Sequence, residues 1–139
     1  MNLYWRWLYV GWLGIIVAAI ILQFYLAGYG VFGFNGLNGF GAHFVVGDLI
    51  GIASLIGIGI AFVTRQPRRV IGLNVLFTVL MIVQFFLAHT GVQVISALHV
   101  VNGLAILGVT GFLTRQAASH AMQNQKDAAP APSSMPFRL

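Results

Sequence analysis

Two of the four histidines in this sequence share a local pattern that could bind a metal. His43 and His99 are each followed four residues later by a glycine, Gly47 and Gly103. Residues four apart lie on the same face of a helix, so each glycine leaves bare backbone beside an imidazole. Imidazole is a common ligand of iron and other transition metals, and a flat macrocycle bound by it needs such clearance. The pattern therefore favours a metal site formed by both histidines.

The composition restricts the kind of protein that can carry such a site. Of the 139 residues, 59% are hydrophobic and 6% are charged, whereas about a quarter are charged in a soluble domain. This balance excludes a soluble globular domain and a disordered chain, and it predicts an integral membrane protein. The absence of cysteine excludes disulfides, thiolate-held iron–sulfur clusters, c-type haem attachment and cysteine-bound zinc. No nucleotide-binding loop, Ser/His/Asp set or carboxylate dyad occurs, so hydrolytic and phosphoryl-transfer chemistry is unsupported.

Four segments are long and apolar enough to span a bilayer, which takes about 20 residues. They cover approximately residues 7–27, 40–63, 70–88 and 94–113. The basic residues lie only before the first segment, between the second and third, and after the fourth: Arg6, Arg65, Arg68, Arg69, Arg115, Lys126 and Arg138. Because basic residues mark the cytoplasmic side, both termini are predicted to be cytoplasmic in a bacterial-type plasma membrane. The net charge of +5 is therefore no argument for a nucleic-acid partner.

The composition changes after Arg115. Residues 117–139 are rich in Ala, Ser, Gln, Asn and Pro, with little that could form a core. We therefore expect residues 1–116 to form the bundle and residues 117–139 to be a flexible cytoplasmic tail. Such a tail becomes ordered when it docks on another protein, which favours subunits of a larger membrane complex as partners.

The two halves of the chain resemble each other at three places in the same order. Gln23–Gly30 matches Gln84–Gly91, His43–Gly47 matches His99–Gly103, and Phe62–Gln66 matches Phe112–Gln116. The matches predict a duplicated helical hairpin, and hence an all-α, up-and-down four-helix bundle. The second and fourth helices of such a bundle are diagonal, about 11–14 Å apart. This separation suits an iron between two axial imidazoles.

With these features the sequence resembles the small four-helix b-type cytochromes, such as the membrane anchors of dehydrogenases. The resemblance covers residues 5–115 in architecture, and in sequence only the two His-x-x-x-Gly pieces. It implies one haem b, bound by His43 and His99 with Gly47 and Gly103 beside the ring. Only one further histidine, His89, lies at membrane level, so a second bis-His haem is excluded. The resemblance implies an electron-transfer or accessory subunit rather than an enzyme, with a quinol in the bilayer as a further candidate partner.

Two other functions remain open at this stage. Each histidine could hold the magnesium of a (bacterio)chlorophyll, or the protein could be a cofactor-free accessory subunit in which the histidines only pack between helices. His89 is an alternative ligand, a partner of the haem propionates or an interface residue. Gln23 and Gln84 are expected to form hydrogen bonds across helices. Asp48, the only acidic residue inside a span, could pair with a neighbouring helix, stay protonated or serve a quinol or proton site.

Overall fold

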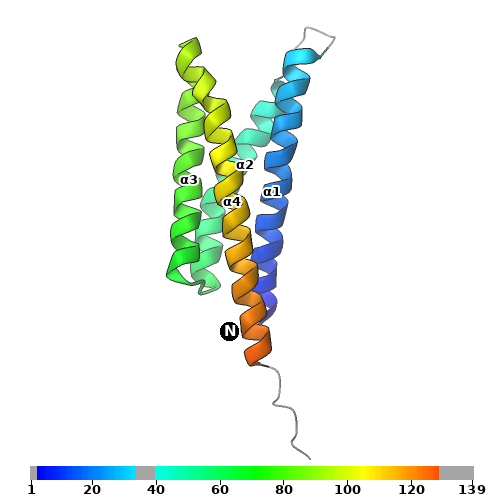
Figure 1. The fold of residues 1–139 in the computed structure, drawn as a ribbon, viewed down its shortest axis with the longest axis vertical. Helices are drawn as coiled ribbons and strands as arrows, with labels where there is room; N and C mark the ends of the chain where they lie inside the picture. The colour runs from blue at the N-terminus through cyan, green and yellow to red at the C-terminus, as the bar shows by residue number, and fades with distance from the viewer. Residues whose placement is uncertain (1–2, 34–39, 129–139) are drawn as a thin grey trace, which may run out of the picture.

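Four α-helices make up nearly all of the part of the chain that the computed structural model describes, residues 3–33 and 40–128. They are α1 (Leu3–Phe32), α2 (Gly41–Val63), α3 (Arg68–His89) and α4 (Gln93–Asp127). Each is long and apolar enough to cross a membrane, and they run alternately up and down (Figure 1). No β-strand occurs in the described residues. The prediction of an all-α four-helix membrane bundle is confirmed.

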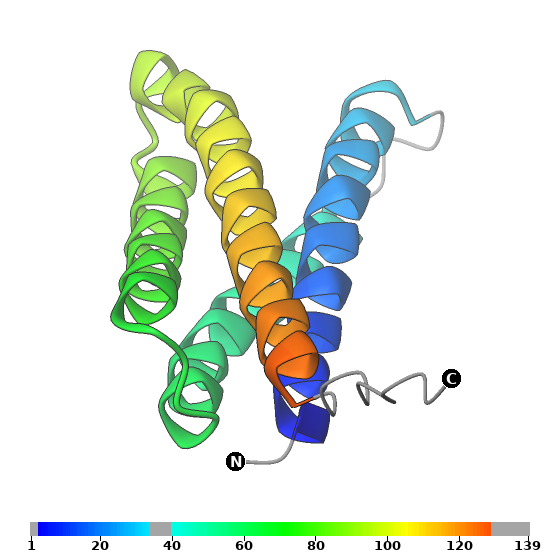
Figure 2. The same cartoon turned by 60° about the horizontal axis from the view of Figure 1, so that its bottom comes forward.

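The helices close into a ring in chain order. α1 packs against α2, α2 against α3, α3 against α4 and α4 against α1, while neither diagonal pair makes a close backbone contact. Figure 2 shows this arrangement from a second side. As expected from the sequence, α2 and α4 are therefore diagonal, so only long side chains from these two helices can meet in the middle of the bundle.

The two ends of the bundle differ in chemistry and are named here after their residues. The arginine end contains the start of α1, the end of α4 and the turn between α2 and α3, which carries Arg65 and leads into Arg68 and Arg69. The histidine end contains the end of α3, with His89, and the turn between α3 and α4. In this turn Gly91 has a φ of 68°, a conformation that glycine adopts without strain. Figure 1 shows the arginine end at the bottom and the histidine end at the top.

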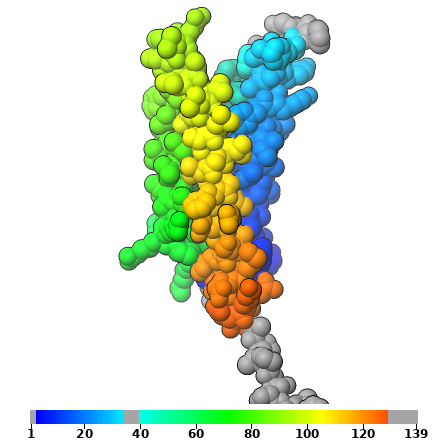
Figure 3. All heavy atoms as spheres, viewed as in Figure 1, coloured from blue at the N-terminus to red at the C-terminus, as the bar shows by residue number. Residues whose placement is uncertain are grey.

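The hydrophobic core occupies the arginine end and the middle of the bundle. Two clusters form it, one around Tyr9, Leu13 and Leu113 and the other around Ile20 and Phe77. Within the described chain, no residue of α1 after Ile20, of α2 before Ile50, of α3 after Thr78 or of α4 before Ile106 is fully buried. The two hairpins accordingly diverge toward the histidine end, where Figure 3 shows a notch between them.

The last part of α4 corrects the prediction of a flexible tail. The helix continues to Asp127, and Ala117 packs in the cluster that contains Tyr9 and Leu13. Ala121, one turn further on, is completely buried. The tail prediction is thus wrong for residues 117–127, because small alanines four residues apart let α4 approach its neighbour closely and favour the helix themselves. Residues 129–139 lie outside the described part.

Candidate functional site: two glutamine–histidine pairs

The structure brings His43 and His99 together near the histidine end. His43 is the third residue of α2 and His99 the seventh of α4, and both are partly buried. Their ring centroids are 6.0 Å apart, with an angle of 58° between the ring planes. Because α2 and α4 are diagonal, the two imidazoles face each other across the middle of the bundle.

Each imidazole is oriented by the backbone of the preceding helix. His43 Nδ1 lies 3.2 Å from the carbonyl oxygen of Gln23 in α1, and His99 Nδ1 lies 3.3 Å from that of Gln84 in α3. A carbonyl oxygen only accepts hydrogen bonds, so Nδ1 carries a hydrogen in both rings, and in the neutral form of such a ring Nε2 carries the lone pair. Proteins commonly orient metal-binding histidines in this way.

The glutamine side chains make different contacts in the two hairpins. Gln23 Nε2 donates to the carbonyl oxygen of His43 at 3.0 Å, whereas Gln84 Nε2 lies 3.0 Å from His99 Nε2. The prediction that both glutamines form hydrogen bonds across helices is confirmed. Asn102, which the sequence did not single out, donates to Gln84 Oε1 at 2.7 Å. In the sequence, Asn102 differs from its counterpart in the first hairpin (α1 and α2), the apolar Val46, and this difference could have drawn attention to it.

A glutamine amide lies beside each of the two glycines that follow the histidines. A Cβ at Gly47 would lie 2.8 Å from Gln23 Nε2, and a Cβ at Gly103 would lie 3.5 Å from Gln84 Nε2 and 3.7 Å from Phe24 Cζ. The glutamine amide of the preceding helix thus lies in the space beside each glycine, so a macrocycle could lie there only after these amides turn away. The two glycines allow the hydrogen bonds of Gln23 and Gln84, and the tighter fit is at Gly47.

The other two polar candidates lie apart from this pair of rings. His89, the last residue of α3, is exposed; its Nδ1 lies 2.7 Å from the carbonyl oxygen of Phe85, and its ring stacks on the Phe85 ring. Asp48 is exposed on α2 and forms no hydrogen bond or ion pair with another residue of the described part. Neither residue contacts an imidazole of the pair through a hydrogen bond.

The described residues contain no group of three or more His, Cys, Asp or Glu that could hold a metal ion. Within this part of the chain, His43 and His99 therefore form a set of two nitrogen ligands. Such a pair suits a metal that already has several ligands of its own.

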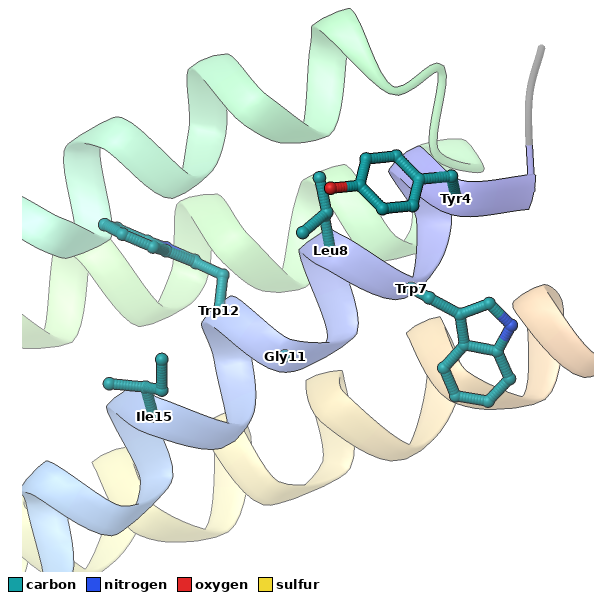
Figure 4. Close-up of a pocket in the computed structure, with 6 residues that line it drawn as sticks. All are labelled: Tyr4, Trp7, Leu8, Gly11, Trp12 and Ile15. Atoms are coloured by element: carbon teal, nitrogen blue, oxygen red, sulfur yellow. The ribbon is translucent and has the colours of Figure 1, made fainter.

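Open hollows occur elsewhere, on the outward face of α1. The one near the arginine end surrounds Gly11, whose missing side chain leaves room between larger neighbours (Figure 4); it is lined by Tyr4, Trp7, Leu8, Gly11, Trp12 and Ile15. A second surrounds Gly28 toward the histidine end. Both are lined by apolar surface, as expected for a helix face that lies against lipid, and neither includes a histidine of the pair.

Comparison with protein families gives a match within the first two thirds of the chain. Residues 23–91 match the model of a family of unknown function (DUF6220). The matched segment is just under half of the chain and includes Gln23, His43 and Gln84 but ends before His99. No curated protein and no solved structure matches the chain.

Proposed function

We propose that the protein is a membrane b-type cytochrome subunit that holds one haem b between His43 and His99. The observation that carries this proposal is the 6.0 Å between the two ring centroids. A metal between two imidazoles needs about 2 Å for each metal–nitrogen bond and roughly 1 Å from each nitrogen to its ring centre, which sums to about 6 Å. The spacing across the bundle therefore suits one iron, once the Gln84 amide that lies 3.0 Å from His99 Nε2 turns away.

The ligand set supports a macrocycle rather than a bare metal ion. Two imidazoles alone leave most positions of an iron unfilled, and a porphyrin supplies the four equatorial nitrogens. Bound there, haem would supply a one-electron redox couple. The chain would contribute His43 and His99 as axial ligands, oriented through Nδ1 by the Gln23 and Gln84 carbonyls. These hydrogen bonds also raise the basicity of Nε2.

We also propose on which side of the membrane the histidine pair lies. The histidines lie toward the end of the bundle opposite Arg65, Arg68 and Arg69. Because basic residues favour the cytoplasmic side, we place the histidine end at the outer face of a bacterial-type plasma membrane and both termini in the cytoplasm. Electron exchange would then take place near the outer face.

The position of Asp48 favours a neighbouring subunit that packs against α2. Ionisable groups in a span almost always face protein or a water-filled cavity rather than lipid. Asp48 is exposed and has no hydrogen-bond or ion-pair partner in the described part of the chain. A second protein that covers this face of α2 would remove the free-energy cost of a carboxyl group facing lipid. Ala117 and Ala121 do not argue for a partner, because both are buried within the bundle itself.

The test is the absorption spectrum of the purified full-length protein, before and after haem is supplied. We expect the sharp reduced-minus-oxidised bands of a low-spin bis-His haem. His43→Ala and His99→Ala should each abolish the low-spin spectrum, since one axial ligand is lost, while the matched control His89→Ala should keep it.

Three results would overturn the proposal. Long-wavelength chlorin bands would indicate a pigment-binding subunit, and a blank spectrum in the presence of haem would indicate a cofactor-free subunit. Loss of haem in His89→Ala together with retention in His43→Ala would show that the ligands are assigned wrongly.

A further inference from the structure

The two glutamine–histidine pairs differ at one atom, Nε2 of the imidazole. His99 Nε2 lies 3.0 Å from the side-chain nitrogen of Gln84. His43 Nε2, by contrast, makes no hydrogen bond with any residue that the structure describes. Both rings are held through Nδ1 by a carbonyl oxygen, so the difference does not arise from the tautomer.

Asn102 determines which way the Gln84 amide points. Its Nδ2 donates one hydrogen to the carbonyl oxygen of Leu80 at 2.9 Å and the other to Gln84 Oε1 at 2.7 Å. The oxygen of the Gln84 amide therefore faces Asn102, and its NH₂ faces His99. Because Nδ1 of His99 carries the ring hydrogen, the NH₂ donates to the lone pair on Nε2. The direction of each hydrogen bond from Leu80 to His99 is thus determined.

No equivalent contact orients Gln23. The position that matches Asn102 is Val46, which packs against the hydrophobic core. Gln23 Nε2 donates to the backbone of His43, and its Oε1 is buried without a hydrogen-bond partner among the described residues. The Gln23 side chain therefore leaves the lone pair of His43 uncovered.

We infer that the two imidazoles are inequivalent ligands. His43 offers to a metal or another electrophile an Nε2 lone pair that no described residue covers, whereas Gln84, positioned by Asn102, caps the lone pair of His99. A group that takes a single nitrogen binds first at His43, and binding at His99 requires the Gln84 amide to turn away. The order in which the two histidines bind a metal rests on the proposed function. The hydrogen bond from Gln84 to His99 does not, because it is present in the protein without haem.

The cap can be tested by acylation of the haem-free full-length protein in detergent. The Nε2 lone pair of a neutral imidazole attacks a carbonyl carbon of diethyl pyrocarbonate, ethyl carbonate leaves, and the ring then loses its Nδ1 hydrogen as a proton to give the N-ethoxycarbonyl imidazole. Mass spectrometry gives the rate of this reaction for each histidine. We expect Asn102→Val, which copies the first hairpin, to raise the rate at His99 by about fivefold, the factor that corresponds to one net hydrogen bond. The rate at His43 should not change, and the exposed His89 serves as an internal reference.

Two further measurements keep the test independent of how well one variant folds. Gln23→Leu is the matched comparison: the Gln23 side chain forms no hydrogen bond with His43 Nε2 but donates to the His43 carbonyl, so the rate at His43 should rise less than the rate at His99 rises in Asn102→Val. In the wild-type protein, ¹⁵N spectra should show hydrogen on Nδ1 of both rings and an Nε2 resonance of His99 shifted upfield of that of His43.

Specific results would overturn the inference. These are equal Nε2 shifts in the wild type, hydrogen on Nε2 of His99, an unchanged rate at His99 in Asn102→Val, or an equal rise at both histidines, which would indicate general loosening. Failure of the proposed function is a separate result, because a protein that never binds haem can still show the capped His99.

Discussion

The environment of each imidazole is made by residues of the preceding helix. The Gln23 and Gln84 carbonyls hold His43 and His99 through Nδ1, and the two side-chain amides fill the space beside Gly47 and Gly103. The fit is closer in the first hairpin, where a Cβ would lie 2.8 Å from the amide nitrogen instead of 3.5 Å. The two matched glycines should therefore tolerate substitution differently.

Gly47→Ala should be less stable than Gly103→Ala by about 1 kcal/mol. At Gly47 the new methyl displaces the Gln23 amide, which then loses its hydrogen bond to the His43 carbonyl, and one hydrogen bond contributes about 1 kcal/mol net. At Gly103 the methyl makes ordinary contacts. Unfolding of both variants in the same detergent measures the difference, and equal stability would contradict the placement of Gln23.

At the scale of helices, polar contacts and close packing replace the hydrophobic effect, because lipid is as apolar as the side chains that face it. Asn74 of α3 illustrates this. It accepts a hydrogen bond from the Tyr9 hydroxyl of α1 at 3.2 Å and donates one to the Ser54 carbonyl of α2 at 3.1 Å. Gly57 of α2 lets these helices approach, since a Cβ there would lie 3.1 Å from Asn74 Oδ1.

Gly57→Ala should destabilise the bundle by about 1–3 kcal/mol, the usual cost of overpacking. Asn74 is buried and bonded on both sides, so it cannot move aside without losing a partner. Gly59→Ala is the matched control, because nothing lies within 4 Å of its Cβ position. Thermal unfolding in detergent measures both variants. A Gly57→Ala protein as stable as the control would show that Asn74 does not join the three helices.

The end of α4 offers a second comparison between buried and exposed positions. Ala121 is completely buried, while Ser119 is exposed two residues earlier. Ala121→Leu should cost about 1–3 kcal/mol through overpacking, whereas Ser119→Leu should change the stability by less than about 0.5 kcal/mol. Equal effects in an unfolding measurement would mean that residues 117–127 are detached from the bundle, as first expected from the composition.

At the scale of the whole molecule, the two hairpins meet in a core at the arginine end and diverge at the histidine end (Figures 1 and 3). The contact between His43 and His99 is therefore made where the bundle is least tightly packed. A flat ligand would enter between the hairpins at this end, and the firmly packed arginine end would hold them together.

The proposed orientation of the bundle can be tested with single cysteines, because the chain contains none of its own. A cysteine at Gln93, at the start of α4, should react with a membrane-impermeant thiol reagent added outside intact cells. A cysteine at Gln125, near the opposite end of α4, should react only after the cells are opened. The reverse pattern would contradict the assignment of the arginine end to the cytoplasm.

The sequence by itself determined the helices and the pairing of the histidines. The length of an apolar run and the turn residues that end it are local properties, so four helices were predicted and the bounds of α1, α2 and α3 were predicted to within about five residues. The start of α4 was predicted equally well, but the helix continues to Asp127, past the predicted end at residue 113. The repeated segments placed His43 and His99 at matching positions, and a short-loop bundle makes α2 and α4 diagonal. Together these properties were enough to bring the two rings near each other.

Only the tertiary structure decided what surrounds the rings. The glutamines that fill the space at Gly47 and Gly103 come from another helix, and the hydrogen bond of Asn102 to Gln84 joins residues of α3 and α4. Composition likewise missed the burial of Ala117 and Ala121, which depends on where α4 meets its neighbour. Such contacts depend on the rotation and register of one helix against the next, and neither is a local property of the chain.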